Sequence, residues 1–218
     1  MVEADAFLRE RFPGAAELIV IDDGSRAGEG IQASDLPPGV LFVGYPQNLG
    51  KGGAVRAGVA AAQGEYIVFT DSDLPFGLEP LALTLDWLRQ GADIVIGDRL
   101  LPESACEADV TPLRRLSSAI FTGIVRNAVG LDFPDTQCGY KGYRAAVARE
   151  LFGKLEITSF AFDVEILLRA LRRGYRVRRQ PLRLIHNEDT SVRLSKHAPR
   201  MFADTFRIAW RGWRGRYD

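Results

Sequence analysis

The 218-residue chain has few cysteines, few histidines and no long apolar run. Its two cysteines, Cys106 and Cys138, suggest no disulfide framework and match no metal-motif spacing, so we expect a reducing, cytoplasmic setting. No apolar stretch approaches the roughly 18 residues of a membrane-spanning helix, and no signal peptide is visible. The Walker ending G-K-S/T and the dinucleotide fingerprint G-x-G-x-x-G are missing too. These absences argue against a disulfide scaffold, a P-loop protein and a dinucleotide-binding protein.

The net charge is zero, but the charges are unevenly spread. Residues 1–150 hold 13 Lys and Arg against 21 Asp and Glu, a net charge of −8, whereas residues 151–218 hold 15 against 7, a net charge of +8. This is ordinary surface charge, or it reflects an acidic metal-binding part followed by a basic part that handles anions near a surface. We expect no nucleic-acid partner.

Strand and helix patterns alternate along the chain. The predicted strands lie at residues 17–22, 40–45, 65–70 and 92–97, a short strand follows residues 135–141, and the last strand signals fall within 175–186. The predicted helices lie at residues 51–63, 78–90, 113–129 and 160–174. Such alternation is typical of βαβ units, and the length suits one sizeable domain. We therefore expect an α/β fold with a mostly parallel sheet flanked by helices.

Two aspartates, Asp71 and Asp73, directly follow the apolar run EYIVF, which we interpret as a buried strand. Ligands of open α/β sheets bind beyond the carboxyl ends of the strands. Two close carboxylates repel each other unless a cation lies between them, and their oxygens suit Mg²⁺ or Mn²⁺. The alternative is a solvated loop in which Asp73 caps the helix that starts near Leu78.

Further motifs lie near predicted strand ends or helix starts: IDDGS (21–25), NLGKGGAVRAG (48–58), TDSD (70–73) and DTQCGYK (135–141). The glycines of the second motif allow close backbone approach, and the following helix N-terminus favours an anion. Together with GDR (97–99) and FDVE (162–165), their order resembles family-two glycosyltransferases of the GT-A fold. The likeness is greatest to the polyprenyl- or dolichyl-phosphate hexosyltransferases, the glucosyl branch especially.

The resemblance implies an inverting, metal-dependent transfer of a hexose from a nucleotide sugar, of the UDP-glucose or GDP-mannose type, to a polyprenyl phosphate. Asp71 and Asp73 would hold Mg²⁺ or Mn²⁺ at the donor diphosphate. The nucleotide-sugar site would also contain Asp22 or Asp23, Lys51, Gln137 and Lys141, with the last two toward the acceptor.

On the acceptor side, the resemblance places a group of cationic and hydroxyl residues near the acceptor phosphate: Arg99, Arg114, Arg115, Ser195 and Lys196. Asp163 falls where related enzymes keep a catalytic carboxylate, and Arg99 would serve catalysis by positioning the acceptor. A hydroxyl acceptor needs a general base, for which Asp163 is the candidate, whereas an anionic phosphate mainly needs positive charge. The alternative for Asp163 is a charge on the solvent side of its helix.

The sequence departs from this family in two places. Family members usually begin with a central strand that ends in a Pro-x-Tyr-Asn-Glu-like motif, whereas here a predicted helix follows Met1 almost at once. We therefore expect the first strand to be missing, with unpaired ladder groups beside it. Pro75 stands near a position where some relatives carry a polar residue that helps the metal site. His186 is either a metal ligand or a strand-end histidine with ordinary hydrogen bonds.

Aromatic residues recur at helical spacing near the end of the chain, and we expect them to share one face of a helix: Phe202, Phe206, Trp210, Trp213 and Tyr217. We divide the chain into a transferase domain at residues 1–197 and an amphipathic helix at 198–218. The stripe either packs on the domain or lies at the cytoplasmic face of a membrane, with arginines toward anionic lipid. Two other functions stay open: transfer to a soluble hydroxyl acceptor, and non-catalytic or truncated nucleotide-sugar binding.

Overall fold

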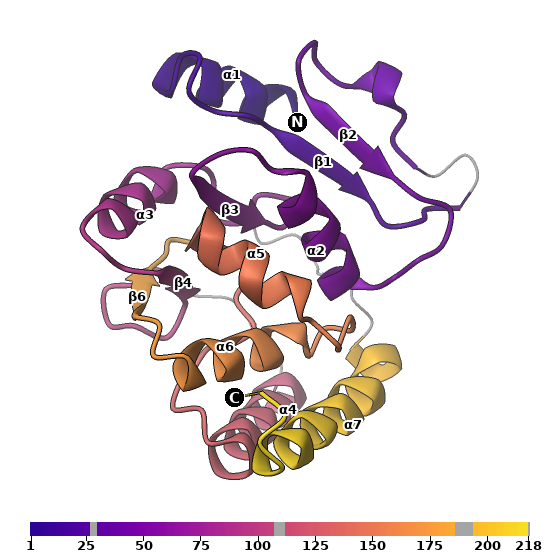
Figure 1. Ribbon diagram of the computed structural model, residues 1–218, viewed down its shortest axis with the longest axis vertical. Coiled ribbons are helices and arrows are strands. Elements are labelled where there is room, and N and C mark those ends of the chain that lie inside the picture. Colours follow the sequence, from indigo (N-terminus) through magenta and orange to yellow (C-terminus); the bar gives the residue numbers. More distant parts are fainter. Residues whose placement is uncertain (27–29, 107–111, 186–193, 218) are drawn as a thin grey trace.

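The computed structural model describes residues 1–26, 30–106, 112–185 and 194–217, without the side chains of residues 112–116 and 194–197 (Figure 1). The strands are β1 (Ile19–Asp22), β2 (Leu41–Gly44), β3 (Tyr66–Thr70), β4 (Ile94–Asp98), β5 (Tyr140–Arg144) and β6 (Val177–Pro181). The helices are α1 (Val2–Arg11), α2 (Lys51–Ala61), α3 (Pro80–Arg89), α4 (Pro112–Ile124), α5 (Ala145–Gly153), α6 (Phe162–Arg172) and α7 (Leu194–Trp213). Short turns of 3-10 and π helix are η1 (Ala33–Asp35) and η2 (Val125–Val129). The order agrees with the predicted alternation.

Two separate sheets carry the described strands. β1 and β2 pair in parallel, with Ile19 opposite Leu41. The larger sheet has the order β3-β5-β4-β6, in which β4 and β6 are parallel. Strand β5 runs antiparallel to both of its neighbours, which the alternating pattern did not predict. Among the described residues, β1 pairs only with β2, and β3 pairs only with β5, so each of the two strands has one edge without a strand partner. This agrees with the expected interruption of the sheet.

Helices cover both faces of the larger sheet. α3 packs on one face and α5 and α6 on the other (Figure 1). All five residues of β4 are buried because strands flank both of its edges. In β3, by contrast, only Ile67 is buried, because β3 lies at the end of the sheet. The interpretation of EYIVF as a buried strand is therefore only partly correct.

The main core lies between the sheet, α5 and α6. The ring of Phe152 lies 5.6 Å from that of Tyr143 and 6.3 Å from that of Phe162. Burying one such side chain stabilises the fold by about 1.5–3 kcal/mol. Every residue from Phe162 to Ala170 is buried, because α7 covers the side of α6 that faces away from the sheet. The predicted amphipathic helix is thus enclosed, charged residues included.

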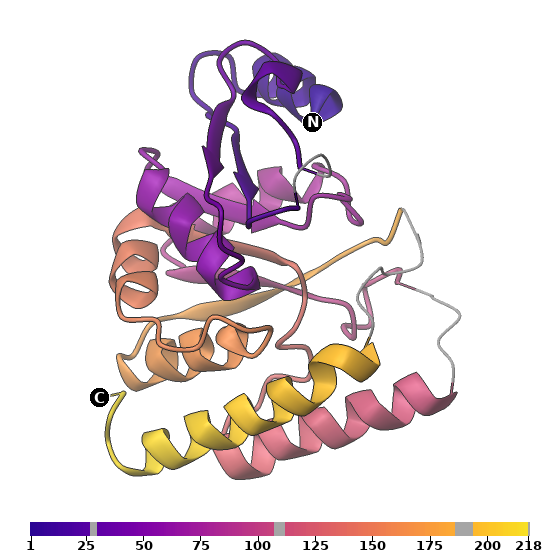
Figure 2. The same cartoon turned by 90° about the vertical axis from the view of Figure 1, so that its right-hand side faces the viewer.

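An outer layer is formed by α4 and α7, which lie side by side (Figure 2). The rings of Phe121 and Phe202 meet edge to face at 5.9 Å between centroids. Ile208 and Ala209 of α7 belong to the main core, so this helix is part of the packed domain. It begins at Leu194, four residues before the boundary at 198 that the sequence predicted. None of the described helices combines the length and apolarity needed to cross a bilayer.

The C-terminal aromatic stripe is divided between two environments. Phe206, Trp210 and Trp213 are 55%, 54% and 73% exposed, respectively. Tyr217 is fully buried in the core. The helix ends at Trp213, and the chain then turns back through Gly215, whose φ is +71°. The expectation that all five aromatics share one helical face is therefore wrong.

Candidate active site

The carboxylate of Asp23 holds the Gly-rich turn against the end of β1. One oxygen accepts the backbone N–H of Leu49 at 2.9 Å and the hydroxyl of Tyr45 at 2.8 Å. The other accepts the N–H of Gly50 at 2.9 Å. These bonds satisfy backbone donors just before α2, where a helix has no partners of its own for them. Neighbouring Asp22 accepts the N–H of Ser25 at 3.1 Å, so it is not tied to the turn.

Lys51 and Asp71 form an ion pair between the first residue of α2 and the loop after β3. The ammonium nitrogen lies 2.7 Å from a carboxylate oxygen, and the side chains are 22% and 39% exposed, respectively. Burial works against the charge of Lys51, but Asp71 and then Asp163 outweigh it, so the pKa of Lys51 lies above its ordinary value. The structure thus places a fixed cation and a partly exposed carboxylate at the carboxyl end of β3.

The loop after β3 rests against the DTQCG turn. The N–H of Asp71 donates to the carbonyl oxygen of Gly139 at 3.2 Å. A Cβ atom at position 139 would fall 1.8 Å from a carboxylate oxygen of Asp71, so only glycine leaves this carboxylate in place. Two motifs that lie far apart in the sequence therefore meet at one carboxylate.

Asp71 and Asp73 could hold a divalent cation together. Carboxylate oxygens suit Mg²⁺ and Mn²⁺, and Mg²⁺ usually binds through one or two carboxylates plus phosphate oxygens and water. Within the described part of the chain, no group of three potential metal ligands occurs, so this site would need oxygens from a ligand. His186 lies outside the described residues. Asp73 is exposed, as the alternative of a solvated loop expects, but the capping role is wrong: α3 begins at Pro80, and among the described residues no side chain caps it.

Arg99 and Asp135 form a two-pronged ion pair beside β4. The guanidinium Nε and Nη2 donate to the two carboxylate oxygens at 2.7 and 2.8 Å. The backbone N–H of Arg99 donates to the same carboxylate at 3.1 Å. Although burial of Asp135 opposes ionisation, these bonds to Arg99 outweigh it and hold the pKa of Asp135 below its ordinary value. The Arg99 side chain is 42% exposed, so part of the guanidinium stays open to solvent.

Lys141 and Asp163 form a second ion pair, which is buried. The ammonium nitrogen lies 2.8 Å from a carboxylate oxygen and donates to the carbonyl oxygen of Cys138 at 2.6 Å. Lys141 is 0% and Asp163 3% exposed, so the alternative of a solvent-side charge at position 163 is wrong. Burial is the largest influence on the Asp163 carboxyl, and it raises the pKa despite Lys141 and Lys51. Lys141 is covered and would act through Asp163.

Gln137 carries a buried amide nitrogen with no hydrogen-bond partner among the described residues. A ligand oxygen could satisfy this donor, because buried polar groups are nearly always paired. Four other residues expected here cannot be placed, since their side chains lie outside the described residues: Arg114, Arg115, Ser195 and Lys196.

Two residues at this edge were missed. Asp135 belongs to the DTQCGYK motif, which could have indicated its role, although its partner Arg99 is 36 positions away. Asp98 of GDR is fully buried and pairs with Arg179 at 2.6 Å, and no local pattern indicates that pair. Asp135 therefore holds the Arg99 guanidinium directly, while the preceding residue, Asp98, is held by Arg179.

Comparison with known proteins shows one family and one fold. The family model described as Glycosyl transferase family 2 matches residues 6–152. A dolichyl-phosphate beta-glucosyltransferase of Trichomonas vaginalis is 31% identical over 188 residues, which covers 82% of this chain and 56% of that protein. A polyprenol monophosphomannose synthase of Mycolicibacterium smegmatis is 29% identical over 215 residues, which covers 92% and 78%, respectively. The chain spans about half the length of the glucosyltransferase relatives it matches first.

Solved structures give the same picture of the fold. Mannosyl-3-phosphoglycerate synthase from Rubrobacter xylanophilus superposes with a TM-score of 0.62 at 19% identity, covering 96% of this chain and 69% of that one. Glucosyl-3-phosphoglycerate synthase from Mycobacterium tuberculosis, in complex with Mn²⁺, UDP-glucose and phosphoglyceric acid, superposes with a TM-score of 0.59 at 19% identity, covering 88% and 68%. The predicted GT-A class is confirmed.

Proposed function

The chain belongs to glycosyl transferase family 2, and we propose that it transfers a hexose from a nucleotide sugar to a polyprenyl phosphate. The likeness to glucosyl and mannosyl transferases that act on lipid phosphates supports this reaction. The donor is a nucleotide sugar of the UDP-glucose or GDP-mannose type.

The cluster at the end of β3 is the observation that carries this proposal. Lys51, at the first turn of a helix, would bind the donor diphosphate, since both the ammonium and the helix N-terminus favour an anion. Asp22 is the better candidate for the ribose or base, because both oxygens of Asp23 already accept bonds from the Gly-rich turn and Tyr45. Gln137 offers the sugar an amide N–H that has no partner within the described part of the chain.

A divalent cation held by Asp71 and Asp73 would neutralise charge on the departing nucleoside diphosphate. The reaction forms one bond, between an oxygen of the acceptor phosphate and the anomeric carbon, and breaks the bond from that carbon to the diphosphate. Attack on the face opposite the leaving diphosphate inverts the configuration at the anomeric carbon. Arg99 would position the acceptor, and Asp135 would fix the guanidinium in place.

Asp163 would have a different role for each acceptor. A phosphate oxygen is anionic near neutrality and needs no general base, so Asp163 would then mainly hold Lys141 in place. A soluble hydroxyl acceptor would need its proton removed, and the raised pKa of Asp163, caused chiefly by burial, suits a base. A solved structure of the same fold is a complex with phosphoglyceric acid, and we therefore retain a soluble hydroxyl acceptor as the alternative.

We further propose that the exposed face of α7 rests on a membrane surface. Phe206, Trp210 and Trp213 project from one helix between exposed arginines, of which Arg207 has a side chain that is 56% exposed. Aromatic rings at headgroup depth with arginines toward anionic lipid are typical of helices that lie in the interface. Such a contact would bring the chain to a lipid-linked acceptor.

The test uses purified protein with Mn²⁺, radiolabelled UDP-glucose or GDP-mannose, and either a short polyprenyl phosphate or 3-phosphoglycerate. We expect organic-extractable label with the polyprenyl phosphate and one of the two donors. Label in water-soluble product alone would establish the alternative acceptor. Nucleoside diphosphate binding without transfer to either acceptor would identify a non-catalytic binder.

A further inference from the structure

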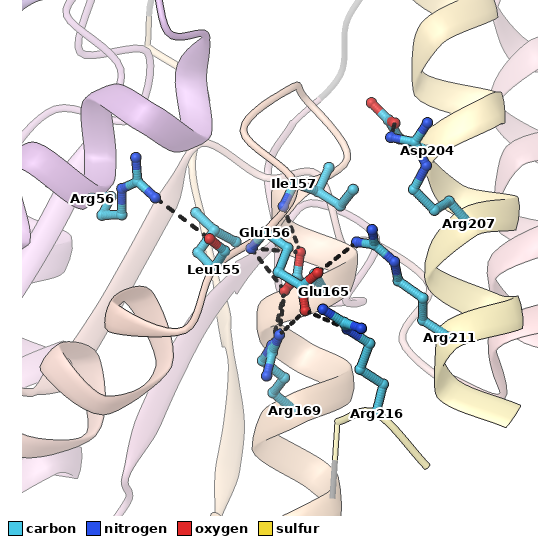
Figure 3. A network of polar contacts seen from close by, with 10 residues as sticks. All are labelled: Arg56, Leu155, Glu156, Ile157, Glu165, Arg169, Asp204, Arg207, Arg211 and Arg216. Carbon is cyan, nitrogen blue, oxygen red and sulfur yellow. Dashed lines mark hydrogen bonds and ion pairs between the residues drawn. The ribbon is translucent and has the colours of Figure 1, made fainter. Parts of the chain in front are cut away.

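Glu165, at the end of the FDVE motif, is a fully buried carboxylate that binds the backbone of another loop. It accepts the N–H of Ile157 at 2.7 Å and the N–H of Glu156 at 3.0 Å (Figure 3). Arg169, one turn along α6, donates its Nε to the same carboxylate at 2.8 Å. A buried charge of this kind is retained only where such partners compensate it. Glu165 therefore fixes the loop between α5 and α6.

That loop in turn supports the Gly-rich turn. The carbonyl oxygen of Thr158, the residue after Ile157, accepts the N–H of Gly52 at 2.9 Å. Gly50 has a φ of +86°, and a Cβ atom there would lie 2.6 Å from the same oxygen. The two glycines on either side of Lys51 thus both pack against the Thr158 carbonyl.

The same loop has a second attachment through Glu156. Its carboxylate lies 3.2 Å from Arg169, 2.9 Å from Arg211 and 3.1 Å from Arg216 (Figure 3). Two of these arginines belong to the end of α7 and the residues after it. The Arg169 side chain is buried and that of Arg211 is partly buried, whereas Arg216 is largely exposed, so its pair with Glu156 contributes little by itself. Together the three arginines hold Glu156 against α6, α7 and the residues after α7.

We propose that Glu165 is a positioning residue for Lys51, acting through the loop backbone and Thr158. Glu165 touches no substrate in this assignment. It fixes the position and orientation of the Gly-rich turn, from which the Lys51 ammonium points toward Asp71. The inference rests on the proposed function, since it takes Lys51 as a ligand of the donor diphosphate. Removing the charge of Glu165 would loosen the turn and weaken donor binding while sparing the acceptor side.

The variant Glu165→Gln tests this, with Glu150→Gln as its matched control. Glu150 also joins secondary elements, since it accepts the Tyr175 hydroxyl at 2.5 Å, but its hydrogen bonds to described residues reach neither the 156–158 backbone nor the Gly-rich turn. We expect Glu165→Gln to raise the UDP or GDP dissociation constant with Mn²⁺ about tenfold, the cost of one buried charged bond, and to leave the acceptor KM unchanged. Glu150→Gln should leave both unchanged.

Hydrogen exchange of the Gly52 amide gives a readout that needs no ligand. It should become about tenfold faster in Glu165→Gln and stay unchanged in Glu150→Gln. Unchanged exchange and unchanged nucleotide affinity in folded Glu165→Gln would overturn the proposal, as would equal losses in both variants. If the wild type binds no nucleotide, the proposed function fails, and the role of Lys51 as a donor ligand fails with it. The exchange rate of the Gly52 amide would still show whether Glu165 holds the Gly-rich turn in place. Should Glu165→Gln not fold, Glu165→Asp, which keeps the charge but shortens its reach, must show the same changes.

Discussion

The ammonium nitrogen of Lys51 lies 2.7 Å from the carboxylate of Asp71, the residue that would also hold a divalent cation. One carboxylate would therefore serve two cations. Without a nucleotide the lysine would neutralise Asp71 and compete with a metal ion. A diphosphate would draw the lysine to itself and leave the carboxylate to the metal.

Lys51→Met should therefore bind Mn²⁺ more tightly than the wild type when no nucleotide is present. We expect an increase of about tenfold, because removing a nearby positive charge changes the binding energy by one or two kcal/mol in a partly solvated site. Nucleoside diphosphate affinity should fall at the same time. Electron paramagnetic resonance of free Mn²⁺ measures the first and calorimetry the second. Lys154→Met, which removes a half-exposed lysine that caps the C-terminus of α5, is the control. Weaker Mn²⁺ binding by Lys51→Met would disprove the competition.

Asp73→Asn should strongly reduce transfer with little effect on folding. The side chain is exposed, so the amide disturbs no packing, but a neutral amide binds Mg²⁺ or Mn²⁺ much more weakly than a carboxylate. We expect turnover to fall on the order of 100-fold, with the melting temperature unchanged. Asp86→Asn replaces another exposed aspartate, on α3, and should keep full activity. Wild-type turnover in Asp73→Asn would show that the metal is held elsewhere.

Asp135 should make the stability of the fold depend on pH. Its folded-state pKa lies below the ordinary value of 3.8, because Arg99 outweighs burial. The stabilisation is therefore fully present above about pH 4 and is lost as the pH falls through the folded-state pKa. Asp135→Asn should lower the free energy of unfolding by about 2 kcal/mol at about pH 7, a figure reduced because Arg99 is partly exposed.

Urea unfolding at about pH 7 and about pH 3 measures this difference, which should shrink at the lower pH. Asp132→Asn provides the control, since Asp132 and Arg126 are 84% and 68% exposed at their 3.3 Å contact and such pairs contribute little. A gap between wild type and Asp135→Asn that stays constant with pH would mean that packing, not the ion pair, carries the effect.

The double variant Trp210→Ser, Trp213→Ser should lose vesicle binding and keep its stability. Both rings are more than half exposed, so little core contact is lost. The wild type should sediment with anionic vesicles at low salt and leave them at high salt, since screening weakens the attraction of arginine to anionic lipid. No binding of the wild type at any salt would instead favour a soluble acceptor.

Tyr217→Ser is the matched control within the same stripe. Tyr217 is fully buried, with the guanidinium carbon of Arg169 4.3 Å from the centre of its ring. This change should lower stability by about 3 kcal/mol, as for other large core deletions, and leave vesicle binding intact at temperatures where the variant is folded.

The helices and strands were largely predictable, because their apolar spacing is a local property. Strand direction was not: nothing in YKGYR indicates that β5 runs antiparallel between β3 and β4. The helical spacing of Phe202 to Tyr217 was read correctly as far as Trp213, but the turn at Gly215 sends Tyr217 into the core. Periodicity says nothing about where a helix ends.

The motifs named most of the residues of the candidate site, but not their pairing. Lys51 and Asp71 are joined across two elements, and Arg99 meets Asp135 over 36 positions. Such pairs follow from the order of strands in the sheet, which the sequence pattern leaves undetermined. The sequence also did not indicate the role of Glu165, because its carboxylate accepts bonds from backbone groups of another loop.

The interruption between β1 and β3 has a consequence for how the protein opens. The segment with α1, β1 and β2 is joined to the larger sheet by no strand pairing in the described chain; it is attached through α2 and through Glu17, which accepts the N–H of Gln63 at 2.7 Å. Cooperative units with few shared hydrogen bonds unfold separately from the rest at a lower free energy. We therefore expect the amides of β1 to exchange through sub-global opening, well before those of β4. A nucleotide bridging Asp22 and Lys51 would suppress that opening and merge the two units into one.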